Sequence, residues 1–439
     1  MAMVVKNNMS AISTLNTLNK NSSALSKSLQ KVSSGMKINS AADDASGYAI
    51  SERMRVQIRG LDQANANTQN GSSMLKVAEG AVSSTVDILK TLKEKVINAA
   101  NDTNTDSDRQ TIQKELNQSI DQINDNANVT FNGKYLVDGS HNKKIVQTST
   151  ALTNESLNSA TASGTALTAL EDRNGNNLNI HSSDNITVSY VKQGKTYSTT
   201  FSVGSTDLGT AINRATSATG AGGSDLSLSQ ANTSYIGLDS SSNSVYTADG
   251  GNALTIAAGV SGTAGQISGF TISVTDSDGN INKSANAVLD NFTESIRAEN
   301  TGDDNSLVLQ VGTKANQAIK VGLTDMRSEA LGLSGSDGTK LNISTQVKAN
   351  AAINVLDNAV QKALDQQTTI GSIESRLEYT SSNLTTASEN VQAAESTIRD
   401  ADMAKEMTNY TKNNVLLQAA QSMLAQANQS SSSVLSLLQ

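Results

Sequence analysis

The chain has 439 residues, a formal net charge of −8, and no proline, cysteine or tryptophan. Zero cysteine excludes disulfides, thiolate nucleophiles and thiolate metal sites, and the acidic balance disfavours nucleic acid as a partner. Without proline, helices can run long without kinks. Aromatic residues make up only 3% of the chain, so its cores must be built from Ala, Val, Ile and Leu.

A helix is predicted near the N-terminus because apolar residues recur there at helical spacing. Its apolar stripe is too narrow to bury itself and therefore needs a partner. The surrounding segment 1–42 contains five Lys and no acidic residue, yet it has neither the apolar core of a secretory signal peptide nor the arginines of a transit peptide. The stripe consists of Ile12, Leu15, Leu18, Leu25, Leu29 and Val32.

Three further helical tracts and a hairpin follow before residue 140. Apolar periodicity predicts helix around 50–61, 75–96 and 112–127. The polar stretch 101–108 indicates a turn with capping residues. Arg109, Lys114 and Glu115 are interpreted as a solvated helix face. Asn132-Gly133 favours a tight hairpin turn, and a short strand is expected over 134–140.

The middle of the chain has a different composition. Residues 141–338 hold 22 of the 30 glycines, which indicates strands, turns and loops rather than helices. The segments 186–191 and 196–203 form a convincing hairpin, and 269–275 and 306–312 suggest further strands. We therefore expect a β-rich insertion of one or two subdomains over 141–340.

The last hundred residues return to helix. Residues 345–402 are periodic throughout and would form a helix roughly 85 Å long, which is typical of a rod or bundle. The final 27 residues carry no charged side chain, so left exposed they would be an aggregation risk. Docking on the chain's own domain is the alternative to pairing with other copies. The candidate contact residues are Met407, Leu416, Leu417, Leu424, Val434, Leu437 and Leu438.

No catalytic, metal-binding or cofactor-binding motif is found. His141 and His181 stand in polar surroundings and outside any H-E-x-x-H motif. The segment 276–280 is rich in Asp and Gly like a calcium-binding loop, but its glycine and glutamate spacing does not match one. A hairpin turn is therefore expected. Asp43 and Asp44 are interpreted as a helix N-terminus. No apolar run is long enough to span a membrane. The chain is therefore not expected to be an enzyme.

Two long blocks, 33–81 and 398–438, closely resemble the N- and C-terminal signatures of bacterial flagellins. The resemblance covers about 1–140 and 340–439. It implies a mainly α coiled-coil and helical bundle formed by both termini, with a β-rich inserted variable domain, in an elongated multi-domain α+β protein. The residues that carry the signature include Asn39, Asp43, Asp44, Gln57, Arg59, Gly60, Gln426 and Asn428.

The resemblance implies a layered subunit of a helical homopolymer. Residues 1–43 and 402–439 would form the inner coiled-coil tube, 44–140 and 341–401 a long-helix bundle with a β-hairpin, and 141–340 the exposed surface. The implied function is a structural subunit of the extracellular motility filament, with many copies of itself as partners. Further implied partners are the type III export apparatus, a cytoplasmic chaperone, the filament cap and the hook-junction proteins.

The family's contact site for Toll-like receptor 5 maps to Lys90, Thr91, Lys95 and Glu115. Strongly recognised flagellins resemble this chain at Glu115 but have Arg and Leu where it has Thr91 and Lys95. Thr91 lacks a multi-donor cation, and Lys95 places charge where an apolar contact is expected. Weakened receptor activation is therefore predicted.

Two other functions compete with the main filament subunit. A hook–filament junction protein shares flagellin-like termini, although the strength of the 33–81 block favours the filament subunit. The insertion could instead house an adhesive or enzymatic activity displayed on the filament. The sequence has no H-E-x-x-H motif, which excludes a metalloprotease of that type. An adhesive role cannot be recognised from a sequence motif.

Overall fold

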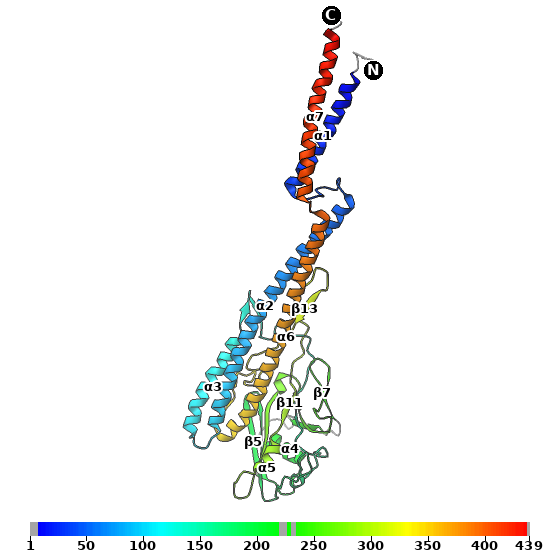
Figure 1. Cartoon of the computed structure of the whole chain (residues 1–439). Helices are drawn as coiled ribbons and strands as arrows, with labels where there is room; N and C mark the ends of the chain where they lie inside the picture. Colours follow the sequence, from blue (N-terminus) through cyan, green and yellow to red (C-terminus); the bar gives the residue numbers. More distant parts are fainter. Residues whose placement is uncertain (1–7, 219–225, 230–233, 437–439) are drawn as a thin grey trace. The chain divides into compact units, whose positions relative to one another are not determined.

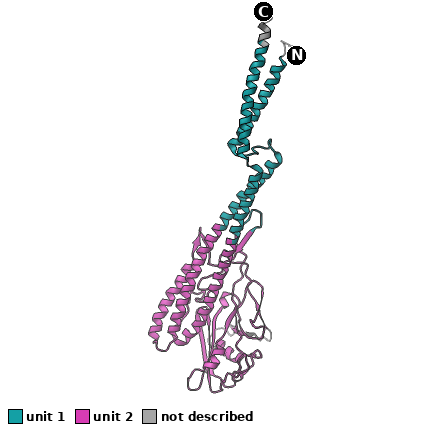
Figure 2. Ribbon diagram, in the orientation of Figure 1, with its two compact units in different colours: residues 1–68, 310–317, 379–439 teal, residues 69–309, 318–378 magenta. Residues whose placement is uncertain are grey.

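The computed structural model of the chain describes residues 8–218, 226–229 and 234–436. These residues form two compact units (Figure 2). Unit 1 comprises residues 1–68, 310–317 and 379–439, and unit 2 comprises residues 69–309 and 318–378. Helices α2 (Ala45–Ala99) and α6 (Gln346–Arg399) each contribute residues to both units.

Unit 1 contains the two terminal helices, α1 (Met9–Ser34) and α7 (Met403–Ser436). Asn8 caps α1 by accepting a hydrogen bond from Ala11 N, and the helix ends at Gly35, whose φ of 71° is a left-handed conformation that glycine adopts without strain. Asp402 caps α7 through Ala404 N and Lys405 N. Both predicted terminal helices are confirmed.

The tracts predicted at 50–61 and 75–96 prove to be one continuous helix, α2. Gly60, Gly71 and Gly80 lie within it, each costing about 1 kcal/mol of helix propensity relative to Ala. Burial of its apolar face offsets this cost. Gly71 also allows the side chain of Leu309 to approach α2 closely, since a Cβ at Gly71 would lie 2.7 Å from Leu309 Cδ1.

In unit 2, α3 (Asp106–Ala127) lies beside the part of α2 that belongs to this unit (Figure 1). Thr105 and Asp108 form a capping box at its start, as expected for the turn over 101–108. In this unit the predicted apolar faces of all three helices are buried. Their fully buried members include Leu75, Val82, Leu89, Val96, Leu116, Ile120, Ile123, Leu356, Ala363, Ile370 and Leu377.

The expectation of a solvated face at Arg109 is wrong. Its guanidinium is buried, with a side-chain exposure of 7%. It donates hydrogen bonds to Ala99 O at 2.8 Å and Asn101 O at 3.0 Å and pairs with Asp106 at 2.9 Å. The side chain thus satisfies carbonyls at the end of α2 and fixes the α2–α3 turn.

The predicted hairpin at Asn132-Gly133 is confirmed, with β1 (Thr130–Phe131) antiparallel to β2 (Lys134–Tyr135). Both turn residues have positive φ, 50° and 75°, as a two-residue hairpin turn requires. The second strand has two residues rather than seven. Leu136 N still donates to Val129 O at 3.2 Å, and both Leu136 and Val137 are buried.

The two largest sheets of the described inserted region are antiparallel. The first has the order β10–β4–β5, with β4 (Asn185–Lys192), β5 (Lys195–Ser202) and β10 (Ile267–Thr275). This confirms the predicted 186–203 hairpin and the strand at 269–275. The second sheet has the order β11–β3–β9–β6. Its strands are β3 (Ala151–Asn154), β6 (Leu226–Ser229), β9 (Leu254–Ala258) and β11 (Thr293–Ile296).

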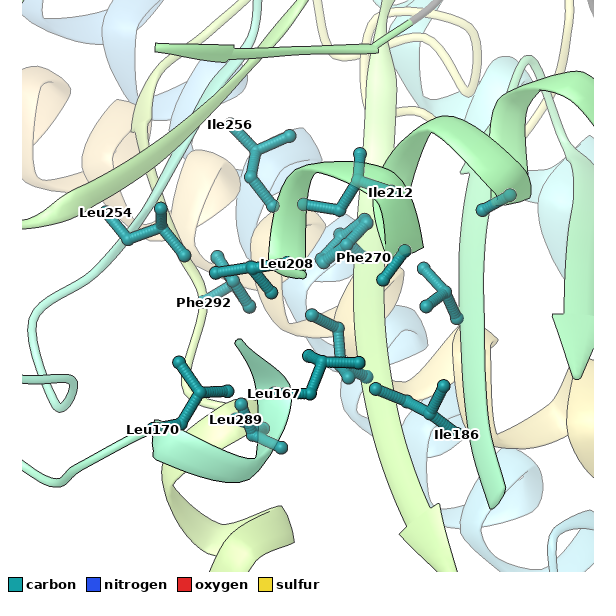
Figure 3. Packing of buried hydrophobic residues seen from close by; sticks show 14 of the residues in the cluster. Leu167, Leu170, Ile186, Leu208, Ile212, Leu254, Ile256, Phe270, Leu289 and Phe292 are labelled. Atoms are coloured by element: carbon teal, nitrogen blue, oxygen red, sulfur yellow. The ribbon is translucent and has the colours of Figure 1, made fainter. Parts of the chain in front are cut away.

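Helices α4 (Leu208–Ala218) and α5 (Lys283–Leu289) join these sheets around one apolar core. Figure 3 shows Leu254 and Ile256 from the second sheet, Phe270 and Ile186 from the first, and Ile212 from α4 converging there. The remaining elements are short. They are η1 (Leu167–Ala169), η2 (Thr263–Gly265), β7 (Tyr235–Leu238), β8 (Ser244–Tyr246), β12 (Leu307–Gln310) and β13 (Ala318–Val321).

Four polar side chains at successive four-residue steps on α6 hydrogen-bond to the inserted region. This spacing places them on one face of the helix. Each bonds to a backbone group that would otherwise lie unpaired against a helix, and Gln366 does so by accepting from Thr324 N at 3.3 Å. The contacts are Asn354 Nδ2 to Phe270 O (3.2 Å), Asn358 Nδ2 to Ser268 O (2.8 Å), Lys362 Nζ to Ala330 O (2.8 Å), and Thr324 Oγ1 to Gln366 Oε1 (2.8 Å).

Replacing Asn358 by Ala should destabilise the inserted region. The substitution removes the donor to Ser268 O and leaves a carbonyl unsatisfied, which costs roughly 1–3 kcal/mol. We expect faster amide hydrogen exchange in β10 and a lower denaturation midpoint. Asn350→Ala, eight residues earlier on α6 and exposed, is the matched control. Equal exchange in β10 for both variants would contradict the proposed role of this contact.

Candidate functional site: the paired terminal helices

Helices α1 and α7 pack antiparallel along their length in unit 1 (Figure 1). Three asparagines make the polar contacts between them. Asn8 Nδ2 donates to Ala427 O and Asn21 Nδ2 to Leu416 O, both at 3.2 Å, and Asn413 Nδ2 donates to Ser28 Oγ at 3.1 Å. These bonds fix the register of the pair, as a buried asparagine does in a coiled coil.

The less exposed residues of both helices follow a heptad pattern. Small and polar side chains alternate with leucine and valine there, which lets the two backbones approach closely. Ser28 and Ala420 are the most buried, each with 7% exposure. This seam consists of Ala11, Thr14, Leu18, Asn21, Leu25, Ser28 and Val32 on α1, and Tyr410, Asn413, Leu417, Ala420, Leu424 and Ala427 on α7.

The other apolar residues of the two helices lie outside the seam. We name them the outer apolar surface. A single exposed apolar residue is common in any protein, whereas this helix pair carries a whole set. Met9 in this surface was missed by the sequence pattern, because it stands in the first turn of α1. The members are Met9 (70% exposed), Ile12 (47%), Leu15 (45%), Leu29 (52%), Met403 (43%), Met407 (45%), Val415 (59%), Leu416 (41%) and Met423 (62%).

The predicted contact residues therefore divide into two groups. Leu18, Leu25, Val32, Leu417 and Leu424 belong to the seam. The outer apolar surface takes Ile12, Leu15, Leu29, Met407 and Leu416. The side chains of Val434, Leu437 and Leu438 lie outside the described residues.

The segment between α1 and α2 contacts the junction of α6 and α7. Lys37 N donates to Arg399 O at 2.7 Å and Ala401 N to Gly35 O at 2.9 Å, so the backbones pair where both helices end. Asp43 accepts hydrogen bonds from Asn39 N and Ser40 N.

These bonds explain the acidic signature residues. The hydrogen bond from Asn39 N holds the pKa of Asp43 below its usual value. Asp44 accepts from Ser46 N and Gly47 N, both at 3.0 Å, at the start of α2. The interpretation of this segment as a helix N-terminus is confirmed.

Arg399 is the buried cation of this junction, with 6% exposure. Its Nη1 lies 2.6 Å from Glu52 Oε1, and its guanidinium lies 5.3 Å from the centre of the Tyr48 ring, a cation–π distance. The bond from Arg399 lowers the pKa of Glu52. Sequence pattern did not single out Arg399, because its partners lie some 350 residues earlier in the chain.

Replacing Arg399 by Leu should loosen this junction. The change removes the nearer of the two cations beside Glu52, the donor to Ser51 Oγ and the Tyr48 contact, so we expect this junction to open more often. Faster limited proteolysis between residues 35 and 44 would report it. Arg55→Leu is the control, because Arg55 also pairs with Glu52, at 3.5 Å, but is exposed. Equal proteolysis of the two variants would contradict the assignment.

The remaining signature residues are mostly exposed. Gln57, Arg59, Gln426 and Asn428 face solvent in the chain as described. Gly60 faces the tip of the β12–β13 hairpin, where a Cβ would lie 3.0 Å from Thr313 Cγ2.

The candidate receptor residues lie on α2 and α3 in unit 2. Lys95 Nζ pairs with Glu115 Oε1 at 3.1 Å. Lys90 pairs with Asp87 at 3.5 Å, and Thr91 Oγ1 donates to Asp87 O at 3.0 Å. Thr91 also lines a shallow hollow of about 490 Å³.

In the described residues, the turn over 276–280 has a structural role. Asp276 accepts hydrogen bonds from Asp278 N and Asn280 N, closing the expected turn over 276–280. Among the described ranges there is no group of three or more His, Cys, Asp or Glu side chains placed to hold a metal ion. None of the helices described is long and apolar enough to cross a bilayer.

Comparison with known proteins agrees with this architecture. Residues 5–142 match the bacterial flagellin N-terminal helical region, and residues 353–438 match the C-terminal helical region. A flagellin of Clostridium tyrobutyricum is 36% identical over 432 residues, covering 97% of this chain and 99% of that protein. The chain belongs to the bacterial flagellin family. It is a structural subunit of the extracellular flagellar filament and assembles with copies of itself.

Other relatives extend over the whole chain. A flagellin of Bacillus subtilis is 29% identical, covering 99% of this chain and 100% of that protein. A flagellar filament 33 kDa core protein of Treponema phagedenis is 30% identical, with the same coverage. Among solved structures, flagellar hook associated protein-3 from Legionella pneumophila shows 15% identity and a TM-score of 0.33, covering 78% of this chain and 97% of that one.

Proposed function

We propose that the α1–α7 pair is the surface through which copies of this chain form the inner layer of the filament. The observation that carries the proposal is the outer apolar surface. Nine large apolar side chains, each more than 40% exposed, remain on a helix pair whose own seam is already filled. Covering them with equivalent surfaces of other copies would release water from apolar area on every subunit.

The layout of the remaining chain follows from this proposal. Residues 1–43 and 402–439 form the inner tube, 44–140 and 341–401 the surrounding bundle, and 141–340 the outer region. The main filament subunit is favoured over a hook–filament junction protein, because flagellins and filament core proteins match this chain over almost its whole length.

Deleting Asn413–Gln439 should abolish polymerisation. The deletion removes Val415, Leu416 and Met423 from the outer apolar surface and Leu417 and Leu424 from the seam. On seeding, the full chain should form long filaments while the truncated chain stays soluble, as electron microscopy and sedimentation would show.

Point variants separate loss of the surface from loss of the seam. Ile12→Ser with Leu29→Ser alters only the outer apolar surface and should raise the critical concentration at least tenfold. Asn16→Ser with Asn19→Ser, exposed on the same helix, is the matched control. Unchanged polymerisation of the truncated chain, or equal effects of the two double variants, would refute the proposal.

The same segment fits the proposed route to the cell exterior. We propose type III export of the unfolded chain, with a cytoplasmic chaperone covering the charge-free segment from Asn413 onward before assembly. A chain without cysteine can thread a channel unfolded with no cross-links to form or reduce. Filament cap and hook-junction proteins would be its contacts at the two ends of the filament.

The proposed role requires no reaction and no cofactor. Every residue it uses acts by packing, hydrogen bonding or pairing of charges. An adhesive or enzymatic activity of residues 141–340 has no group of side chains in its favour within the described parts of that region, and it is not proposed.

We further propose weak activation of Toll-like receptor 5. The ion pair between Lys95 and Glu115 supports this, because a glutamate engaged by its own chain must release that partner before accepting another. Thr91 in addition offers a single hydroxyl, which is directed to Asp87 O.

Thr91→Arg combined with Lys95→Leu should increase receptor activation at least tenfold in a reporter-cell assay. The pair of changes adds a multi-donor cation and frees Glu115. Lys114→Leu, an exposed position on α3, is the control for loss of a surface charge. Full potency of the unchanged chain, with no gain in the double variant, would contradict the proposal.

A further inference from the structure

The dipeptide Asn-Gly occurs three times in the chain, at positions 70–71, 132–133 and 174–175. In this dipeptide the backbone nitrogen of glycine can attack the side-chain amide carbon of asparagine, because glycine has no Cβ to obstruct the approach. The attack needs a nitrogen that is not already hydrogen-bonded and a backbone that can move. How fast each dipeptide reacts is therefore decided by the structure around it.

The dipeptide at 70–71 is protected by a helix. Asn70 and Gly71 lie inside α2, which runs without interruption from Ala45 to Ala99. An interior helical N–H donates to the carbonyl four residues earlier, so the Gly71 nitrogen is occupied. A Cβ at Gly71 would lie 2.7 Å from Leu309 Cδ1, so another segment also packs closely against the backbone there. Attack by Gly71 would require local unfolding of the helix.

The dipeptide at 174–175 is exposed but restrained by Asp172. Gly175 N donates to Asp172 O at 3.0 Å, and Asn174 N donates to Asp172 Oδ1 at 2.9 Å. The first bond occupies the attacking nitrogen. The Asp172 carboxylate also disfavours the negative charge that a backbone nitrogen acquires when it loses its proton. Both effects should slow the reaction in this turn.

The dipeptide at 132–133 forms the exposed turn of the β1–β2 hairpin and lacks these restraints. Among the described residues, Gly133 N has no acceptor within hydrogen-bond distance. A Cβ at Gly133 would meet no atom within 4 Å beyond its chain neighbours. The next residue is Lys134, whose positive charge favours loss of a proton from a neighbouring backbone nitrogen. The attacking nitrogen is therefore unoccupied, uncrowded and followed by a cation.

The hairpin that carries this turn can also open at low cost. Its ladder contains two residue pairs, and it forms a two-stranded sheet of its own. A two-stranded hairpin is at best marginally stable by itself. Brief opening therefore lets Asn132 leave its left-handed conformation, with φ of 50°, and reach the geometry for attack.

We propose that Asn132 is a modification site of this chain, where the side-chain amide is converted to a carboxylate without an enzyme. Gly133 N loses its proton and bonds to Asn132 Cγ, the Cγ–Nδ2 bond breaks, and Nδ2 leaves as ammonia. Water then adds to either carbonyl of the cyclic imide and opens it, giving aspartate or isoaspartate. Both products carry one additional negative charge, and no atom is oxidised or reduced.

The isoaspartate product should not fit the turn. A two-residue hairpin turn of this type requires positive φ at both central residues, whereas the backbone of isoaspartate is one carbon longer. The hydrogen bond from Leu136 N to Val129 O, at 3.2 Å, follows directly after the ladder. In chains modified at Asn132, the amide hydrogen of Leu136 should exchange about tenfold faster or more.

Peptide mapping of the full-length chain by mass spectrometry tests the proposal. After incubation of the folded chain at mildly alkaline pH, Asn132 should deamidate about threefold faster or more than Asn174, and about tenfold faster or more than Asn70. An isoaspartyl methyltransferase should label the peptide that contains residue 132. In denaturant, where the surrounding structure is lost, the three rates should agree within about threefold.

Asn132→Gly is the matched variant, because glycine adopts positive φ without strain and carries no amide. It should lose the label at residue 132 and keep the slow Leu136 exchange of the unmodified chain. A rate at Asn132 no faster than that at Asn174 in the folded chain overturns the proposal. The same preference for Asn132 in denaturant would overturn the structural cause assigned to it.

Discussion

The antiparallel contact between α1 and α7 is the constraint on which the proposed assembly surface of this chain depends. It brings together segments almost four hundred residues apart, through a seam of small and polar residues interrupted by leucine and valine. Because that seam occupies only one side of each helix, apolar residues outside it stay exposed and make up the outer apolar surface. The surface that we propose for contact with other copies is thus built jointly by the two ends of the chain, and neither end carries it alone.

Amide side chains recur wherever segments distant in sequence meet. Asn8, Asn21 and Asn413 set the register of α1 against α7, and Asn354 and Asn358 hold β10 against α6. A chain with few aromatics has little large apolar surface with which to specify one arrangement. Hydrogen bonds to backbone carbonyls supply that specificity, because a misplaced partner would leave a buried acceptor unsatisfied.

The parts of the fold that depend on local pattern were predictable. Long helices, their caps and the 186–203 hairpin follow from periodicity and turn residues over neighbouring positions. Strands β3, β9 and β11 were missed, because they are four or five residues long and pair with distant segments. Arg399 was not singled out, and Arg109 was wrongly expected to be solvated. A charged residue at helical spacing resembles a solvated one until the carbonyls and carboxylates around it are placed.

By itself, the sequence determined the helical ends, the β-rich middle, the family and the need of both terminal stripes for a partner. These properties reside in residue types and their spacing. Only the tertiary structure decided which apolar residues fill the α1–α7 seam and which stay outside, and which charges on α2 and α6 pair with each other. Those distinctions depend on which side of each helix meets its neighbour, and that side is set by contacts between residues hundreds of positions apart.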